Sequence, residues 1–486
     1  MIKNDIYEIE IEDIGTDGEG IGHVNDKQSG KSMAVFVKDT VVGDKAKIGI
    51  VKVKKNYAYG RLIELISPSS FRVTPLCDRA KQCGGCSLMH MSYEKQLDYK
   101  WNKVKNCLER IGGLKNAGEL MEPIIGMDTP FYYRNKMQFP VGLDKNGKVV
   151  LGFYAGRTHS IIDMTKCHIG HDINNYLIDG LRKWLQNWQD FTSDFIYDEE
   201  KHKGLVRHIL TRVGFVSGEL MVCVVINGDN FPDKVSGDCL GQLLEVLNDS
   251  VAKYNEKNVR KITLKSVSIN INKEKTNRIL GDTCRTLWGQ SYITDYIGDL
   301  QFRISPLSFY QVNPVRTKVL YDKAVEYAML DGNETVWDMY CGIGTISLCL
   351  AKKAGKVYGV EIVPQAIEDA KLNAQINELT NVEFFCGKSE EVVPRFYAEK
   401  GIKPDVIVVD PPRKGCDKTL LDTIVEMSPE RLVYVSCDPA TLARDIATLT
   451  ESGFDVVKVG VVDQFGHSTH VETVVLLSQR KAIKTK

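Results

Sequence analysis

From about residue 309 onward, short apolar runs alternate regularly with polar and apolar segments of helical length. These runs occupy residues 335–339, 356–360, 382–385, 406–409 and 432–435. Parallel strands need helical crossovers of this kind, since a tight turn can join only antiparallel neighbours. The alternation therefore predicts a C-terminal α/β domain over 309–486 with a mostly parallel sheet. Two final runs, 454–462 and 471–477, are separated by only a short loop and predict an antiparallel hairpin at the sheet edge.

The rest of the chain reads differently. A single core rarely grows beyond about 250–300 residues, so 486 residues predict several domains. Residues 1–68 show short alternating strands between turn-rich stretches, which is typical of a small OB-like β-barrel. Residues 69–308 mix strand and helix patterns and predict a central α+β domain. The expected fold class is thus multidomain: N-terminal β-barrel, central α+β domain and C-terminal Rossmann-like α/β domain.

Charge and hydropathy narrow the choice of partners. Lysine plus arginine and aspartate plus glutamate both number 63, so any affinity for nucleic acid must come from local patches. One such patch, residues 52–61, combines lysines and tyrosines with Arg61, which suits contacts with phosphates and stacked bases. A solvated edge strand whose lysines prevent aggregation is an equally good interpretation. No apolar run approaches the roughly 20 residues of a membrane span, and the N-terminus lacks a signal-peptide pattern. We therefore expect no membrane partner and a cytoplasmic location.

One helix is predicted with particular clarity. Over residues 93–111 the apolar side chains fall on one helical face, and Gly112 and Gly113 end the pattern. The predicted apolar face consists of Leu97, Trp101, Val104, Leu108 and Ile111.

Three strand ends of the C-terminal domain predict a cofactor pocket. A glycine loop at 338–345 follows the first strand, but Ser347 stands where a third glycine would complete a dinucleotide fingerprint. Glu361 ends the second strand, where an acid can accept hydrogen bonds from both ribose hydroxyls. Asp410 ends the fourth strand, and two prolines stiffen the loop after it. A tight turn is the ordinary interpretation of the glycine pair alone, but the three strand ends together favour an adenosine-containing ligand of the methyltransferase type.

The fifth strand ends at Cys437, on the same edge as Glu361 and Asp410. A thiolate that adds to carbon 6 of uracil makes carbon 5 nucleophilic enough to accept a methyl group, and a base must then remove the carbon 5 proton. Glu472, at the start of the last strand, is the candidate base. The alternative readings are a small buried hydrophobe for Cys437 and a surface carboxylate for Glu472.

A cysteine cluster follows the barrel. Cys77, Cys83 and Cys86 form a C-x5-C-x2-C run, and Cys167 is a plausible fourth ligand. Four thiolates can hold zinc or an iron–sulfur cluster, and the spacing leaves both open. The spacing differs from the C-x3-C-x2-C run of radical S-adenosylmethionine enzymes. Two basic runs, 134–136 and 207–208, are candidates for phosphate contacts, with solvated charges as the alternative reading.

Four segments, 309–314, 410–415, 436–439 and 470–473, closely resemble the bacterial RNA uridine-5-methyltransferase family, and the resemblance covers essentially the whole chain. It implies that Cys437 is the nucleophile and Glu472 the proton acceptor. It also implies that the N-terminal barrel is a TRAM domain, which binds RNA. The resemblance assigns S-adenosylmethionine contacts to Gln311, Tyr340, Glu361 and Asp410.

The family members with a TRAM domain carry a 4Fe-4S cluster on this cysteine pattern, so the resemblance implies Cys77, Cys83, Cys86 and Cys167 as its ligands and makes zinc the less favoured occupant. The chain has both the TRAM domain and the cysteines, and so it is similar to the branch that methylates 23S ribosomal RNA. Thr345 departs from the asparagine common in relatives. A monomer acting on ribosomal RNA is expected.

Three alternatives remain open: a tRNA uridine-5-methyltransferase, an enzyme that methylates an exocyclic nitrogen of a base or a protein side chain, and a non-catalytic RNA-binding ribosome-assembly factor. Cys437 separates nitrogen methylation from the favoured reaction, because a nitrogen lone pair needs no covalent adduct. Binding of S-adenosylmethionine separates an assembly factor from an enzyme.

Overall fold

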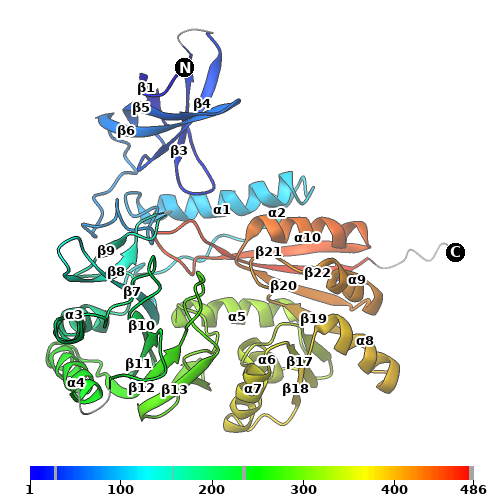
Figure 1. Ribbon diagram of the computed structural model, residues 1–486. Coiled ribbons are helices and arrows are strands. Elements are labelled where there is room, and N and C mark those ends of the chain that lie inside the picture. Colours follow the sequence, from blue (N-terminus) through cyan, green and yellow to red (C-terminus); the bar gives the residue numbers. More distant parts are fainter. Residues whose placement is uncertain (27–29, 157, 233–236, 481–486) are drawn as a thin grey trace.

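The computed structural model describes residues 1–26, 30–156, 158–232 and 237–480 (Figure 1). At the N-terminus, six strands form one sheet in the order β1-β5-β6-β4-β3-β2 around an apolar core. Alternate residues such as Val35 and Val37 point inward, as the period of a half-buried strand requires. Lys54 and Lys55 lie in the turn between the last two strands. The strands are β1 (Ile6–Glu10), β2 (Asp13–Ile14), β3 (Gly20–Asn25), β4 (Ser32–Lys38), β5 (Lys45–Val53) and β6 (Tyr57–Ser67).

The central part is built on a seven-stranded sheet in the order β13-β12-β11-β10-β7-β8-β9. Two amphipathic helices, α3 (Ile173–Thr192) and α4 (Cys239–Lys257), pack on one face and bury the apolar side chains of the sheet. The strands are β7 (Lys136–Leu143), β8 (Val149–Tyr154), β9 (Ile161–Asp163), β10 (Val206–Val213), β11 (Glu219–Ile226), β12 (Thr263–Ile271) and β13 (Thr283–Gly289).

The C-terminal sheet has seven strands in the order β18-β17-β16-β19-β20-β22-β21. As predicted, β16–β20 are parallel, and β21 and β22 form an antiparallel hairpin at one end of the sheet. Strand β22 pairs with both β20 and β21, so that β21 is the edge strand. The strands are β16 (Thr335–Asp338), β17 (Lys356–Glu361), β18 (Val382–Cys386), β19 (Val406–Val409), β20 (Arg431–Ser436), β21 (Phe454–Val462) and β22 (Glu472–Gln479).

Helices cover both faces of this sheet, so its inner strands are nearly continuous apolar runs. One face packs against α5 (Pro314–Ala328), α6 (Thr345–Ala351) and α7 (Pro364–Ile376). The other packs against α8 (Ser389–Lys400), α9 (Lys418–Met427) and α10 (Pro439–Glu451).

Parts of the span 69–308 also pack on the C-terminal sheet. The hairpin of β14 (Ile293–Ile297) and β15 (Leu300–Ile304) joins the core on the α5 side. Helix α1 (Tyr93–Arg110) joins the core on the α10 side, and the short α2 (Ala117–Leu120) follows it. After α2, Met121 and Ile125 bridge to Val459 and Val462 of the edge strand β21. The boundaries at 68/69 and 308/309 stay a prediction.

Helix α1 forms where the sequence predicts it, but its apolar face is only partly right. Val104 and Leu108 are fully buried, whereas Ile111 is 48% exposed. Gln96 and Lys100 are buried instead, although both are polar. Their burial depends on partners far along the chain, which helical periodicity does not reveal. Among the helices of the described residues, none is long and apolar enough to cross a membrane.

Candidate active site

The polar residues of the site gather at one edge of the C-terminal sheet. Glu361 and Asp410 stand at the carboxyl ends of the parallel strands β17 and β19, and Cys437 directly follows β20. Parallel strands place these ends along one edge, where α/β sheets bind ligands. Glu472 begins β22, which runs antiparallel to β20, and therefore starts at the same edge. The register pairs Ser436 with Thr473, so that Cys437 and Glu472 come next on the two strands.

Three carboxyls, the buried Asp338 and Glu472 and the half-buried Asp410, lie along this edge. Burial is the main cause that raises the pKa of Glu472 to about 8, and the neighbouring Asp410 raises it further. Burial followed by repulsion from Asp338 raises the pKa of Asp410 to about 7. Burial also raises the pKa of Asp338, to about 6. The Ser347 hydroxyl donates a hydrogen bond to this carboxyl at 2.6 Å, which acts to lower the pKa. The site is therefore prepared to hold protons on carboxyls near neutral pH.

Cys437 shares this electrostatic environment. Burial raises the pKa of its thiol to about 11, with further contributions from Glu472 and Asp410, while Arg413 lowers it. Arg413 also lowers the pKa of Glu472. Arg413 thus stabilises negative charge on both groups, a role that was not predicted from the sequence. Its position directly after the Asp410-Pro411-Pro412 turn is the sequence signal that points to it.

The glycine loop has the backbone shape that a closely bound ligand requires. Gly342 and Gly344 have φ of +53° and +85°, a region that side chains disfavour. A Cβ on Gly344 would lie 3.0 Å from the ring of Phe384, whereas one on Gly342 would have no heavy atom within 4 Å. The open side of the loop is therefore at Gly342, two residues after Tyr340.

The remaining predicted cofactor residues lie on three different segments. Glu361 Oε1 accepts a hydrogen bond from the backbone amide of Val363 at 2.9 Å, which orients the carboxylate beyond β17. Gln311 is buried just before α5, and its backbone carbonyl accepts from the Asn135 side chain at 2.9 Å. Tyr340 is half-buried in the glycine loop. Thr345, which departs from the family pattern, exchanges a hydrogen bond with Tyr321 at 3.1 Å.

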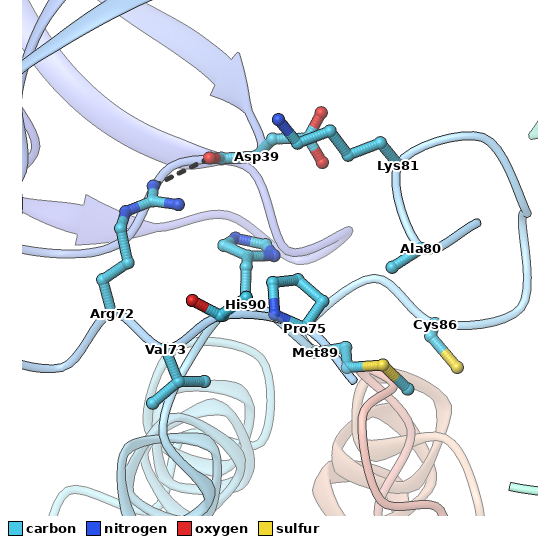
Figure 2. Close-up of a pocket in the computed structure, with 10 residues that line it drawn as sticks. Asp39, Arg72, Val73, Pro75, Ala80, Lys81, Cys86, Met89 and His90 are labelled. Carbon is cyan, nitrogen blue, oxygen red and sulfur yellow. Dashed lines mark hydrogen bonds between the residues drawn. The ribbon is translucent and has the colours of Figure 1, made fainter. Parts of the chain in front are cut away.

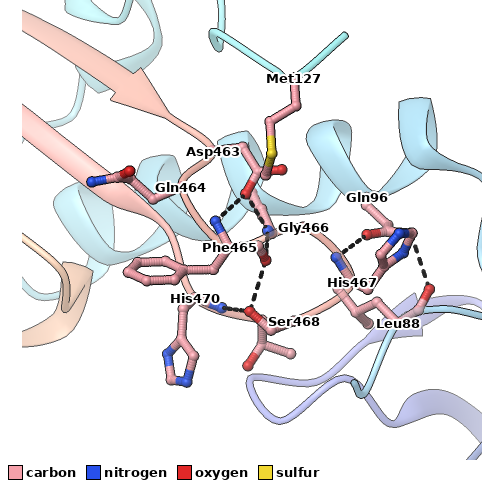
Figure 3. A network of polar contacts seen from close by, with 12 residues as sticks. Leu88, Gln96, Met127, Asp463, Gln464, Phe465, Gly466, His467, Ser468 and His470 are labelled. Carbon is pink, nitrogen blue, oxygen red and sulfur yellow. Dashed lines mark hydrogen bonds and ion pairs between the residues drawn. The ribbon is translucent and has the colours of Figure 1, made fainter. Parts of the chain in front are cut away.

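The loop that leads into Glu472 is held by buried polar contacts with α1 (Figure 3). The fully buried Lys100 ammonium donates to Asp463 at 2.6 Å and to the Phe465 carbonyl at 2.9 Å. The Tyr93 hydroxyl donates to the other oxygen of Asp463 at 2.7 Å. The side-chain oxygen of Gln96 accepts from the His467 amide at 2.9 Å. These contacts account for the polar residues on the buried face of α1 and position the start of β22.

The four predicted cluster cysteines come together from two segments far apart in the sequence, residues 77–86 and residue 167. Cys77, Cys83, Cys86 and Cys167 all line one cavity of about 410 Å³. Burial raises the pKa of each thiol. Negative charge on the other three sulfur atoms raises the pKa of Cys86 further. No group of three or more His, Cys, Asp or Glu side chains within the described ranges is arranged to hold a metal ion. The iron–sulfur cluster stays a prediction.

The cysteine loop also faces the N-terminal barrel across a second cavity of about 240 Å³ (Figure 2). Arg72 closes one side of it, since its guanidinium donates to the Asp39 carbonyl at 2.9 Å and pairs with Asp44 at 2.5 Å. Cys86 lines both cavities. The barrel and the cysteines are therefore neighbours in the structure as well as in the sequence.

Of the two basic runs, 207–208 is engaged within the protein. Arg207 donates to the carbonyls of Asn272 and Glu274 at 2.7 and 2.8 Å and stacks on Tyr197. Burial lowers the pKa of His208 to about 4, so this imidazole is neutral. A phosphate contact from this run is not supported by the geometry.

Comparisons with known proteins agree with this architecture. Residues 285–480 match the family model described as tRNA (Uracil-5-)-methyltransferase, and residues 3–63 match the TRAM domain. An RNA methyltransferase of Clostridium tetani, described as uncharacterized, is 47% identical over 98% of this chain and 97% of its own length. A similarly described protein of Bacillus cereus is 46% identical over 98% and 97%.

Among solved structures, the tRNA (uracil-54, C5)-methyltransferase of Pyrococcus abyssi, in complex with S-adenosyl-L-homocysteine, aligns with a TM-score of 0.73 at 25% identity. The alignment covers 97% of this chain and 100% of that one. The comparisons confirm the predicted multidomain fold and the resemblance to the RNA uridine-5-methyltransferase family. Relatives of such identity and coverage show that the chain belongs to the RNA uracil-5-methyltransferase family and carries the TRAM domain at its N-terminus.

Proposed function

We propose that this chain methylates carbon 5 of a uridine in 23S ribosomal RNA, with Cys437 as the covalent nucleophile and Glu472 as the base. The observation that carries this proposal is the register that brings a thiol and a buried carboxyl side by side at the ligand-binding edge of the sheet. A nitrogen methyltransferase needs no such pair.

In the proposed reaction the Cys437 thiolate bonds to carbon 6 of uracil, and the electron pair of the 5,6 double bond makes carbon 5 nucleophilic. After carbon 5 has gained its methyl group, the Glu472 carboxylate takes the proton from carbon 5, the 5,6 double bond returns and the thiolate leaves. The raised pKa of Glu472, about 8, makes its carboxylate a stronger base than an exposed one. Arg413 favours the ionised forms of both groups.

S-adenosylmethionine fits the residues at the edge of the sheet. The glycine loop is open at Gly342, and Glu361 stands beside it with one carboxylate oxygen oriented by a backbone amide. Gln311, Tyr340, Glu361 and Asp410 would hold the cofactor, which when bound supplies an electrophilic methyl group on sulfur. The S-adenosyl-L-homocysteine in the aligned Pyrococcus abyssi enzyme supports this assignment.

A mechanism-based trap tests the reaction. RNA with 5-fluorouridine carries a fluorine that no base can remove as a proton, so the covalent adduct persists. Wild-type protein with S-adenosylmethionine should give a complex that survives denaturing gel electrophoresis, and Cys437→Ala should give none. Cys386→Ala, which removes an exposed thiol at the end of β18, is the matched control and should trap normally. Full methylation by Cys437→Ala would contradict the proposal.

The choice of ribosomal RNA rests on the combination of the TRAM domain with the cysteine cluster. The aligned Pyrococcus abyssi enzyme acts on tRNA and makes tRNA the second candidate. Mapping 5-methyluridine in 23S ribosomal RNA and in tRNA from cells with and without the gene separates them. Loss from tRNA alone would overturn the ribosomal assignment.

We further propose that Cys77, Cys83, Cys86 and Cys167 hold a 4Fe-4S cluster. The observation in favour is that all four thiols line one cavity and that neighbouring thiol charges raise the pKa of Cys86 after burial. Four thiolates are a common ligand set for such a cluster. With every iron held by protein, the cluster would serve the structure or RNA positioning.

A further inference from the structure

The turn between β2 and β3 of the N-terminal barrel is packed against other parts of the molecule. Hydrogen bonds from the Gly15 amide to the Glu19 carbonyl and from the Gly18 amide to the Gly15 carbonyl close this turn, which comprises residues 15–19. Figure 1 shows the barrel next to α1, and the C-terminal sheet lies on the other side of this helix. The turn therefore lies where it can contact both α1 and the loops of the C-terminal sheet.

Helix α1 holds the turn through two side chains that lie one helical turn apart. The Tyr99 hydroxyl is within hydrogen-bond distance of the Gly15 carbonyl oxygen at 2.9 Å and of the Thr16 carbonyl oxygen at 3.1 Å. The Lys103 ammonium donates to the Thr16 carbonyl at 3.3 Å. Residues four apart share one face of a helix, so this face of α1 is turned toward the barrel.

Lys103 also reaches the loop that leads into the proposed base. Its ammonium donates to the Thr469 carbonyl at 3.0 Å, and Thr469 precedes Glu472 by three residues. Burial lowers the pKa of Lys103, and the charge of Asp438, the residue after Cys437, is among those that raise it. One ammonium thus joins the barrel turn to the loop that ends at Glu472.

The turn and this loop also pack directly against each other at Gly18. A Cβ on Gly18 would lie 2.9 Å from the Leu88 side chain and 3.1 Å from the Thr469 side chain, and φ of this residue is +87°. Leu88 is fully buried, and its amide donates to the His467 carbonyl at 2.9 Å. The turn therefore fits without space for a side chain against the same loop that Lys103 holds.

A domain that served only to tether RNA would need none of these contacts with the active-site loop. We propose that the β2–β3 turn of the TRAM barrel is part of the framework of the active site, and that Lys103 is a positioning residue for Glu472. The barrel then contributes to removal of the carbon 5 proton. This inference rests on the proposed role of Glu472 and adds the segment that holds it in place.

Steady-state kinetics with the full chain test the inference. The substrates are unmodified transcripts of 23S ribosomal RNA and of tRNA, with saturating S-adenosylmethionine. Lys103→Met keeps the apolar stem without the ammonium and should lower kcat about 10–100-fold, the effect of a slightly misplaced catalytic group. The value of kcat/KM for RNA should stay close to that of the wild type, because proton removal follows the irreversible methyl transfer. A covalent complex with ordinary uridine RNA should accumulate on denaturing gels.

Two variants of α1 control for charge. Lys103→Arg keeps a cation that can donate to both carbonyls, and it should retain most of the wild-type turnover. Lys105→Met removes the ammonium that pairs with Glu109 two residues further along the helix, and it should behave as wild type.

Two glycines of the barrel provide a second, independent pair. Gly18→Ala inserts a methyl group between the turn and the loop and should give the same kinetic pattern as Lys103→Met. Gly30→Ala also places alanine at a positive φ, +67°, but its Cβ would have no heavy atom within 4 Å. It should behave as wild type. If Lys103→Met does not fold, this pair decides the question.

Hydrogen exchange of backbone amides gives a readout that does not depend on activity. Lys103→Met should accelerate exchange in segments 13–20 and 463–472, because local opening no longer breaks the contacts of the ammonium. Lys105→Met should accelerate exchange in neither segment.

The outcomes separate this inference from the proposed function. Wild-type kcat in a folded Lys103→Met protein would overturn the inference, and so would a loss confined to kcat/KM for RNA. Unchanged exchange in both segments would overturn it as well. If the wild-type protein methylates neither transcript, faster exchange in both segments of Lys103→Met would support the contact between barrel and loop and refute the proposed function.

Discussion

Cys437, directly after β20, and Glu472, the first residue of the antiparallel strand β22, both lie one residue beyond the pair Ser436 and Thr473. Their interaction is electrostatic as well as geometric, because the Glu472 charge adds to burial in raising the pKa of the Cys437 thiol. Because the thiol is the proposed nucleophile and the carboxyl the proposed base, substitution of each should block a different step of the reaction.

Glu472→Gln should allow the thiol to add and the methyl group to transfer but should block removal of the carbon 5 proton. We expect turnover to fall by about 10²–10⁴, the usual contribution of a general base. A covalent complex should then accumulate with ordinary uridine RNA on denaturing gels. Glu430→Gln, which changes an exposed carboxyl just before the opposite end of β20, should behave as wild type. Normal turnover by Glu472→Gln would exclude it as the base.

The raised pKa of Glu472 also predicts how stability depends on pH. Folding raises this pKa from 4.5 to about 8, so the folded state binds the proton more tightly than the unfolded state. The stabilising contribution is complete below about pH 4.5 and is lost as the pH rises through about 8. Thermal melts from about pH 5 to pH 9 should therefore show a smaller loss of Tm for Glu472→Gln than for wild type. Parallel curves would contradict the assignment.

Lys100 and Asp463 form a fully buried ion pair between α1 and the loop before Glu472. Lys100→Ala leaves the Asp463 carboxylate buried without its cation, which should lower the free energy of unfolding by about 3–5 kcal/mol. Denaturant titration measures this loss. Lys115→Ala, at an exposed position after α1, should cost less than about 0.5 kcal/mol. Similar losses for the two variants would show that the pair adds little.

The cluster prediction can be checked by metal analysis. Anaerobically purified wild-type protein should be brown and contain iron and sulfide in equal amounts, and Cys167→Ser should lose most of the iron. Cys386→Ser should keep it, because that thiol lies at the end of β18. Colourless wild-type protein rich in zinc would refute the iron–sulfur assignment.

Gly344 and Gly342 offer a graded test of the glycine loop. Both have positive φ, but only at Gly344 would a Cβ press against the Phe384 ring, at 3.0 Å. Gly344→Ala should therefore destabilise the protein and weaken cofactor binding more than Gly342→Ala, by about 1–3 kcal/mol. Calorimetric titration with S-adenosyl-L-homocysteine compares them. An equal loss would mean that backbone conformation alone limits both positions.

Much of the C-terminal architecture follows from local pattern. Strands β19 and β21 have the bounds that the sequence predicts. For β19 the reason is a continuous apolar run between turn residues, which leaves a buried strand few alternatives. The edge that carries Cys437, Glu361 and Asp410 follows from the same alternation, because parallel strands must end together.

Contacts between residues far apart in the sequence could not be predicted from these local patterns. Helical periodicity placed Ile111 on the buried face of α1, yet Lys100 is buried there because Asp463, 363 residues away, neutralises it. The position of β22 between β20 and β21 is likewise a matter of pairing, which hydropathy does not encode. Local sequence thus specified the strands and the chemistry at their ends. Which strands are neighbours, and which charges are buried together, depended on partners that only the folded chain brings within reach.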